Sequence, residues 1–152
     1  DKENVFFGYQ GRAFGKENPK YITIMLKEKN KIFGLDRINS NQHIFVVEGP
    51  IDSLFLDNCL AVAGADFKLD MDEKDYTVIY DKEPRNEEII KRMEKSIEQN
   101  QSIVIWPDNI EEKDINDMIL SGRTSVEIHR IISKNTFSHL HAKTRLINWK
   151  KI

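Results

Sequence analysis

From His43 onward, short apolar segments alternate with segments of helical periodicity, and this alternation restricts the possible folds more than any other feature of the sequence. The apolar segments have the length of strands, and helical segments separate several of them. Repeated units of this kind predict an α/β fold with a largely parallel sheet covered by helices. The predicted strands are HIFVV, LAVAG, YTVIYD and SIVIWP, and the predicted helices between them are IDSLFLDN and NEEIIKRMEKSIEQN.

Two further regions flank these units. Before them, KYITIML alternates apolar and polar residues and predicts a strand, and KIFGL predicts a second short strand after the turn at KEKNK. After them, DINDMILSG predicts a short helix, TSVEIHRIISKN a longer helix with a capping pair at Thr124 and Glu127, and HAKTRLINWKKI a basic amphipathic helix. We therefore expect a β-rich N-terminal element at residues 1–42, an α/β domain at 43–122 and a helical C-terminal segment at 123–152.

The net charge of −2 is unevenly distributed along the chain. Residues 1–42 carry a net charge of +3, residues 43–120 carry −11, and residues 121–152 carry +6. Such an acidic middle is typical either of a solvated surface or of a metal centre between phosphate-binding arms. The single cysteine, Cys59, excludes a disulfide framework and a cysteine zinc site. No long apolar run or secretory leader is present, so we expect a soluble, cytoplasmic protein without a membrane partner.

Acidic residues follow three of the predicted strands. Because parallel strands end at one edge of a sheet, these side chains are expected to converge there. Like charges gathered at one edge repel each other unless protons or cations neutralise them. Oxygen ligands suit the hard cations Mg²⁺ and Mn²⁺. The predicted metal ligands are Glu48, Asp81, Glu83, Asp114, Asn116 and Asp117.

The motifs VVEGPIDSLF, AVAGAD, YDKE and EEKDINDMI resemble, in order and spacing, a TOPRIM domain. This Rossmann-like metal-binding fold is shared by primases, topoisomerases and some nucleases. The resemblance covers roughly residues 44–122. The second acidic motif, YDKE, departs from the family pattern, because Asp81-Lys82-Glu83 stands where Asp-x-Asp is usual. In addition, Pro84-Arg85-Asn86 replaces the Ala-Gly pair that often follows in bacterial primases. Glutamate is a longer carboxylate that can still bind a metal ion.

The upstream segments GYQGRAFGKENPKYITIM and KIFGLDRI extend the resemblance to the core of bacterial-type and phage-type DNA primases, from about Phe7 to Gly122. The resemblance implies a nucleotidyltransferase that synthesises RNA primers during DNA replication. It implies a catalytic fragment, and the sequence does not tell whether this fragment is active by itself. The implied partners are a single-stranded DNA template, ribonucleoside triphosphates, the RNA:DNA hybrid and a replicative helicase that binds through absent parts. The implied location is the cytoplasm of a bacterial cell or phage-infected host.

The resemblance also implies roles for individual residues. Glu48, Asp81 and Glu83 would be catalytic metal ligands, and Glu48 is a candidate to assist deprotonation of the 3′-hydroxyl. Asp114, Asn116 and Asp117 would help to hold a second metal ion. Gly49 and Asp52 would support the first motif, although a charge at a helix N-terminus explains Asp52 equally well. Arg12 and Lys20 would contact template or nucleotide phosphates.

The sequence is also compatible with two other functions. A TOPRIM nuclease would use the same metal ions to cut nucleic acid instead of extending it. A TOPRIM-like module without catalytic activity would bind DNA or a partner. Ordinary helix capping and surface exposure are the structural alternatives for the acidic residues.

Overall fold

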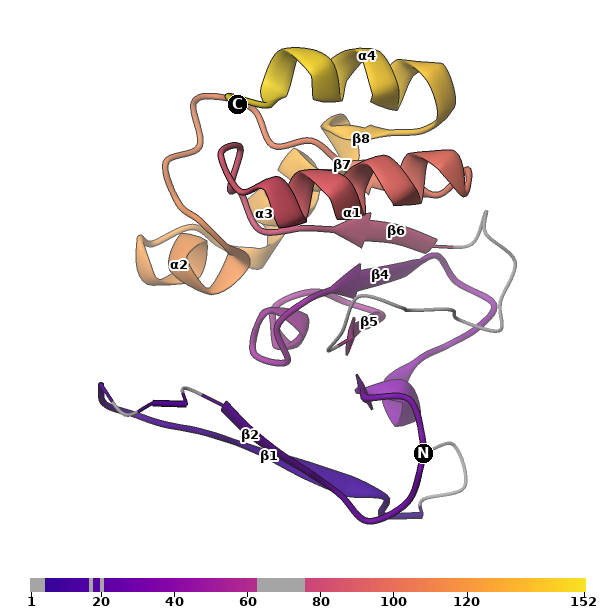
Figure 1. Cartoon of the computed structure of the whole chain (residues 1–152), viewed down its shortest axis with the longest axis vertical. Helices are drawn as coiled ribbons and strands as arrows, with labels where there is room; N and C mark the ends of the chain where they lie inside the picture. Colours follow the sequence, from indigo (N-terminus) through magenta and orange to yellow (C-terminus); the bar gives the residue numbers. More distant parts are fainter. Residues whose placement is uncertain (1–4, 17, 20, 63–75) are drawn as a thin grey trace.

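A computed structural model describes residues 5–16, 18–19, 21–62 and 76–152 of the chain. Within these residues, a two-stranded ribbon lies beside a six-stranded sheet that is flanked by helices (Figure 1). The ribbon pairs β1 with β2, and the sheet has the strand order β3-β5-β4-β6-β7-β8. The strands are β1 Gly8–Arg12, β2 Tyr21–Met25, β3 Ile32–Phe33, β4 Ile44–Val47, β5 Cys59–Val62, β6 Tyr76–Ile79, β7 Ser102–Val104 and β8 Thr136–Phe137.

The centre of the six-stranded sheet is parallel, because β5, β4, β6 and β7 run in one direction. The two edge strands, β3 and β8, are antiparallel to their neighbours and only two residues long. The predicted α/β fold with a largely parallel sheet is therefore confirmed. Strand β8 was not predicted, since two residues are too short to show an alternating pattern.

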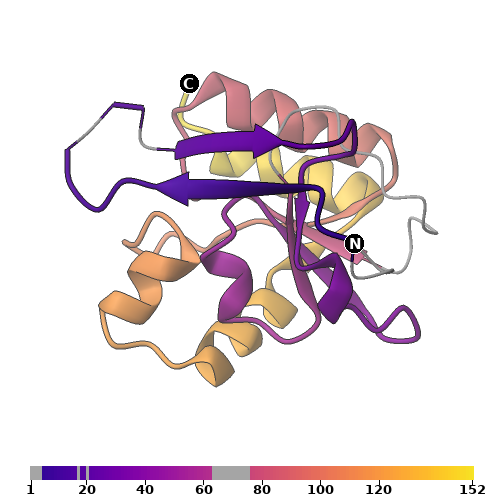
Figure 2. The ribbon, with the colours of Figure 1, turned by 90° about the horizontal axis from the view of Figure 1, so that it is seen from below.

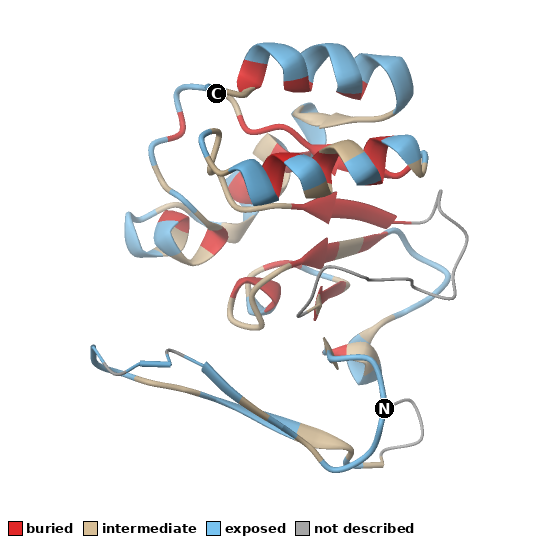
Figure 3. Ribbon diagram, in the orientation of Figure 1, coloured by how far each residue is buried: buried red, intermediate tan, exposed pale blue. Residues whose placement is uncertain are grey.

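Helices cover both faces of the sheet. The helices are α1 Glu87–Glu98, α2 Ile115–Leu120, α3 Ser125–Lys134 and α4 His139–Trp149, with 3₁₀ turns η1 Leu35–Arg37 and η2 Asp52–Leu54. Helices α1 and α4 enclose one core with the sheet, and α2 and α3 enclose the second. In β4, Val46 belongs to the first core and Val47 to the second, as the two-residue period of a strand requires. Figure 3 shows the buried strands between these layers.

The apolar stripe of α1 explains why this helix forms where it does. Ile89, Ile90, Met93 and Ile97 are buried at helical spacing, and the other side of the helix is exposed or half-buried. Asn86 caps the helix by accepting hydrogen bonds from the backbone N–H groups of Glu88 and Ile89. Because α1 begins immediately after the second acidic motif, its cap also fixes the position of that motif.

The prediction of a helix at IDSLFLDN is wrong, because in this segment the structure has only the 3₁₀ turn η2 at Asp52–Leu54. The backbone N–H groups of Leu54 and Phe55 donate to carbonyls three residues earlier, which is the 3₁₀ pattern. Asn58 then has a positive φ of 48°, and its side chain donates to the carbonyls of Asn39, Gln42 and His43. This turn leads directly into β5 and leaves no length for an α-helix.

The N-terminal region contributes to both sheets. Strand β2 pairs with β1, whereas β3 pairs with β5 in the main sheet. Figure 2 shows the ribbon across the side of the molecule that faces the viewer. The predicted boundaries at residues 42/43 and 122/123 stay predictions. Strands from all three predicted segments take part in the six-stranded sheet. None of the helices in the described ranges is long and apolar enough to cross a membrane.

The cap of α1 gives a first testable prediction. Replacing Asn86→Ala removes the acceptor for two helix N–H groups, so the free energy of unfolding should fall by about 1 kcal/mol in urea denaturation. Thr124→Ala is the matched control, because Thr124 caps α3 within a capping box and should cost a similar amount. An unchanged stability of the Asn86 variant would contradict the capping role.

Candidate active site

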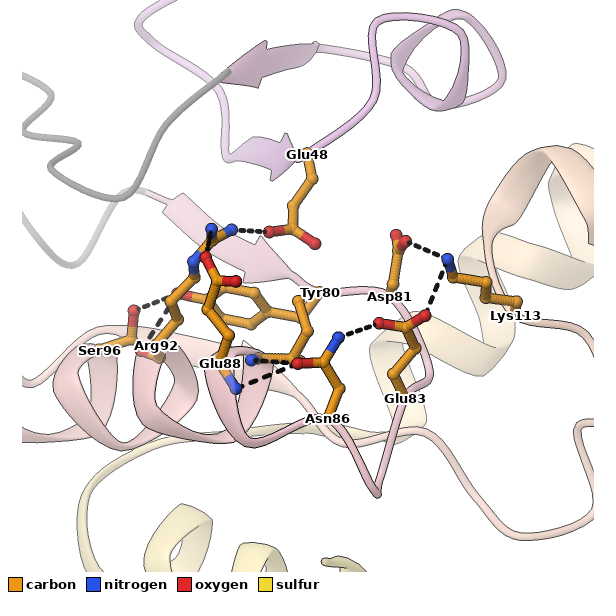
Figure 4. A network of polar contacts seen from close by, with 10 residues as sticks. Glu48, Tyr80, Asp81, Glu83, Asn86, Glu88, Arg92, Ser96 and Lys113 are labelled. Atoms are coloured by element: carbon orange, nitrogen blue, oxygen red, sulfur yellow. Dashed lines mark hydrogen bonds and ion pairs between the residues drawn. The ribbon is translucent and has the colours of Figure 1, made fainter. Parts of the chain in front are cut away.

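The carboxylates of Glu48, Asp81 and Glu83 lie at one edge of the sheet, called here the acidic edge. The register of the two central strands creates this edge. Strands β4 and β6 are parallel neighbours, with Val47 opposite Ile79. Glu48 directly follows β4, and Asp81 lies two residues beyond β6, so both leave the sheet at its carboxyl edge. Neighbouring strands are about 4.8 Å apart, which brings these residues close together. Figure 4 shows their carboxylates on adjacent segments.

A buried network fixes the turn before Asp81. The indole Nε1–H of Trp106 donates to the carbonyl oxygen of Tyr80 at 2.8 Å, and Trp106 is only 2% exposed. The hydroxyl of Tyr80 lies 2.8 Å from the Oγ atom of Ser96 in α1. Burial raises the pKa of Tyr80, so its hydroxyl remains protonated at neutral pH. The backbone that carries Asp81 is therefore held from both faces of the sheet.

Glu48 forms an ion pair with Arg92 of α1. The Nη1 atom of Arg92 lies 2.6 Å from Oε1 of Glu48, and about a quarter of each side chain is exposed. The Nη2 atom of Arg92 contacts Glu88, one helical turn earlier in α1. Figure 4 shows the other carboxylate oxygen of Glu48 pointing toward Asp81. Arg92 thus fixes one oxygen of Glu48 and directs the second into the acidic edge.

The negative charge of Asp81 is unfavourable in its surroundings. Burial, followed by repulsion from Glu48, raises the pKa of Asp81 to about 7, although Lys113 opposes the shift. The charges of Asp114 and Asp52 raise it further. A cation at this position would relieve the repulsion and hold Asp81 ionised.

Glu83 is in the opposite electrostatic situation. Lys113 Nζ lies 2.8 Å from Oε1 of Glu83, and the side-chain amide of Asn86 donates to Oε2 at 2.6 Å. These hydrogen bonds, that from Lys113 above all, lower the pKa of Glu83. The same Lys113 Nζ lies 3.7 Å from Oδ2 of Asp81. Lys113 therefore lies between the two carboxylates of the second acidic motif (Figure 4).

Gly49 and Asp52 hold the loop after β4. Asp52 is 9% exposed, and its Oδ1 atom accepts a hydrogen bond from the backbone N–H of Asn116 at 2.8 Å. Burial raises the pKa of Asp52. A Cβ atom at Gly49 would collide with Oδ2 of Asp52, so a side chain at position 49 would displace this buried carboxylate. The pair joins the first acidic motif to the third.

The third acidic segment lies at the start of α2. Asp114 caps the helix, since its Oδ1 atom accepts from the N–H of Asp117 at 2.7 Å. The charge of Asp114 also raises the pKa of Asp81, which places it within electrostatic reach of the second motif. Asn116 is half-buried and Asp117 is exposed. Two residues of this segment are therefore linked to the acidic edge. Asp114 acts on Asp81 through its charge, and Asn116 donates its backbone N–H to Asp52.

One of the two basic residues expected to bind phosphate, Arg12, lies in the ribbon. Arg12 ends β1, and its guanidinium lies 5.5 Å from the ring centroid of Tyr21 on β2. Burial raises the pKa of Asp52 and the charge of Arg12 opposes this rise, so this end of the ribbon is near the acidic edge. Lys20 lies outside the described residues.

The chemistry of the side chains at the acidic edge suits a hard cation, because Glu48, Asp81 and Glu83 all offer carboxylate oxygens. Burial and the neighbouring charges also make the ionised form of Asp81 unfavourable, and a cation would offset this. In the part of the chain that the structure describes, however, no three His, Cys, Asp or Glu side chains gather into a metal-binding group. Protein cations are bound instead: Arg92 to Glu48, and Lys113 to Asp81 and Glu83.

The chain was compared with known proteins. No protein-family model matches it. It is 39% identical over 150 residues to the DNA primase of Enterobacteria phage T4, an alignment that covers 95% of this chain and 44% of that protein. This chain is similar to part of a DNA primase. It spans less than half the length of the phage T4 primase.

Solved primase structures share the fold. A DnaG catalytic core superposes with a TM-score of 0.62 at 16% identity, covering 97% of this chain and 53% of that one. A DNA primase domain from Pseudomonas aeruginosa gives a TM-score of 0.61 at 16% identity, with 90% and 49% covered. A DnaG primase catalytic domain bound to single-stranded DNA gives 0.62 at 16% identity, with 97% and 53% covered. The chain therefore has the fold found in part of these primase catalytic domains.

Sequence reasoning missed the two cations of the site. Arg92 lies on the polar side of α1, where its charge is indistinguishable from that of other surface residues. Lys113 directly precedes Asp114 in the third motif, and this position was its one available signal. Both partners depend on tertiary packing, which local patterns do not contain.

The Arg92–Glu48 pair gives a second testable prediction. Arg92→Met leaves a half-buried carboxylate without its cation, so the free energy of unfolding should fall by about 1–2 kcal/mol in urea denaturation. Lys91→Met is the control from the next residue of α1, because its pair with Glu87 is 70–75% exposed and should change stability by less than about 0.5 kcal/mol. Equal effects of the two variants would refute the anchoring of Glu48 by Arg92.

Proposed function

We propose that this chain belongs to the catalytic core of a DNA primase with a TOPRIM domain and takes part in the synthesis of RNA primers on single-stranded DNA. The observation that carries the proposal is the 39% identity to the phage T4 primase over 95% of the chain. The convergence of Glu48 and Asp81 at one sheet edge supports it independently. The cytoplasm of a bacterial cell or phage-infected host is the proposed place of action.

The proposed cofactor is Mg²⁺ or Mn²⁺. Glu48, Asp81 and Glu83 would hold it, and Asp114, Asn116 and Asp117 would contribute to a second ion. When bound, such ions stabilise the charge that develops on the attacking and leaving oxygens of phosphoryl transfer. Glu48 has an additional role in this proposal, because its second oxygen faces the acidic edge and can accept a proton from a 3′-hydroxyl.

The proposed nucleic-acid contacts involve the basic flanks. Residues 1–42 and 121–152 carry net charges of +3 and +6, and phosphate attraction by such segments is independent of base sequence. Arg12 and Lys20 are proposed to contact the phosphates of template or nucleotide. Ribonucleoside triphosphates, the RNA:DNA hybrid and a replicative helicase are proposed as further partners.

Incorporation of labelled ribonucleotides on single-stranded DNA tests this function against a TOPRIM nuclease, which would shorten the DNA instead. The assay should use the chain itself and a chimaera in which the chain replaces the matching segment of the phage T4 primase. Primer synthesis by either protein supports the proposal. A chimaera that is folded and binds DNA but makes no primers would refute it, and favour a binding module.

Asp81→Asn separates catalysis from binding. The substitution removes a charged metal ligand, so primer synthesis should be lost. It also relieves repulsion from Glu48, so the thermal midpoint without metal should stay the same or rise, most clearly at pH 8, where Asp81 with its pKa of about 7 is charged in the parent. Binding of single-stranded DNA without metal should not weaken, because a charge that repels phosphate is gone.

The control for Asp81 is Asp108→Asn. Asp108 is 85% exposed and pairs with Lys151, so its substitution should leave primer synthesis unchanged. An Asp81→Asn variant that makes primers at the parent rate would exclude Asp81 as a catalytic ligand. A lowered thermal midpoint with unchanged activity would instead assign it a structural role.

Arg12→Glu tests the ribbon as a phosphate contact. Binding of single-stranded DNA should weaken by the same factor for different sequences, and the slope of log K against log salt should decrease by about 1 or slightly more. Fluorescence anisotropy at several salt concentrations measures both. Lys91→Glu on α1 is the charge-matched control. If both variants bind like the parent at every salt concentration, Arg12 is a solvated surface residue.

A further inference from the structure

Lys113 lies where two carboxylates of the acidic edge converge. Its Nζ atom is 2.8 Å from Glu83 and 3.7 Å from Asp81, which belong to one short motif after β6. The hydrogen bond to Glu83, followed by the charges of both carboxylates, raises the pKa of Lys113, so the ammonium is fully charged at neutral pH. One lysine therefore supplies the positive charge that the second acidic motif requires.

The backbone of Lys113 is fixed although its side chain is accessible. Its carbonyl oxygen accepts a hydrogen bond from the N–H of Lys82 at 2.6 Å, and the Lys82 ammonium contacts the carbonyl of Ile110 in the same loop. The Lys113 side chain is 51% exposed. The ammonium can leave the carboxylates by rotation of its own side chain, without any movement of the loop.

Arg92 differs from Lys113 in this respect. Its side chain is 27% exposed, and its guanidinium contacts both Glu48 and Glu88. Each cation contacts two carboxylates, but the planar guanidinium is less exposed and offers a rigid set of donors, so it is harder to remove than an ammonium on a flexible chain. Of the two basic side chains described at the acidic edge, Lys113 is thus the easier one to displace.

We propose that Lys113 is an internal counter-ion that occupies the Asp81–Glu83 pair and is displaced when a divalent cation binds. The inference rests on the proposed function, because it assumes that these carboxylates are metal ligands. No covalent bond changes in the exchange: the lysine keeps its proton, its ammonium moves into solvent, and the carboxylates pass from one cation to another.

The exchange explains how several carboxylates coexist in a folded chain without metal, because Lys113 contacts both Asp81 and Glu83 and reduces their repulsion. The consequence is that Lys113 weakens metal binding while it stabilises the metal-free protein.

Mn²⁺ binding measured by electron paramagnetic resonance tests this inference without an activity assay. Lys113→Gln should bind Mn²⁺ about fivefold more tightly than the parent, and its thermal midpoint without metal should be lower. Lys113→Arg should bind Mn²⁺ more weakly than the parent, since a guanidinium can hold both carboxylates. Lys151→Gln is the matched control, because Lys151 is 53% exposed and pairs with Asp108 outside the site; its Mn²⁺ affinity should match the parent's.

The outcomes distinguish the two proposals. If the parent binds Mn²⁺ and Lys113→Gln binds it equally or more weakly, Lys113 is not a displaced counter-ion, and the proposed metal site survives. If neither protein binds Mn²⁺ and both are folded, the metal site and the inference both fail. If Lys113→Gln does not fold, the Lys113→Arg variant decides, and Mn²⁺ binding equal to or tighter than the parent's overturns the inference.

Discussion

The parallel pairing of β4 with β6 is the constraint on which the acidic edge depends. With Val47 opposite Ile79, the first and second acidic motifs leave the sheet beside each other. A shift of one residue in the pairing would turn the side chains of the shifted strand to the opposite face of the sheet and disrupt the packing of both cores. The buried residues on both faces of the sheet therefore fix the register, and the register brings Glu48 next to Asp81.

The cost of this arrangement is electrostatic. Burial, followed by repulsion from Glu48, raises the pKa of Asp81, because carboxylates gathered at one edge repel each other. The chain offsets the repulsion with two basic residues, each of which contacts two carboxylates: Arg92, whose side chain is largely covered, and the more exposed Lys113. The acidic edge is thus balanced by cations from other elements, and the distribution of net charge along the chain gives no indication of this balance.

Much of the fold could be predicted from the sequence. The four central strands lie in continuous apolar runs, helix α1 has apolar residues at helical spacing, and the capping pair Thr124 and Glu127 is present as a capping box. The sequence pattern could not show that IDSLFLDN forms a 3₁₀ turn instead of a helix, because the turn at Asn58 depends on hydrogen bonds to carbonyls distant in the sequence. For the site, the strand ends indicated which carboxylates converge, whereas the partners Arg92 and Lys113 required the packing of α1 and of the loop before α2.

The two-residue edge strands have a consequence for the behaviour of the protein at high concentration. Strands β3 and β8 pair antiparallel with the outer parallel strands and present few free backbone groups of their own. A longer, flat edge would offer hydrogen-bond donors and acceptors to a strand of another molecule. The short edge strands therefore protect the parallel strands against intermolecular pairing, and substitutions that detach β3 or β8 would promote aggregation even where they leave the acidic edge intact.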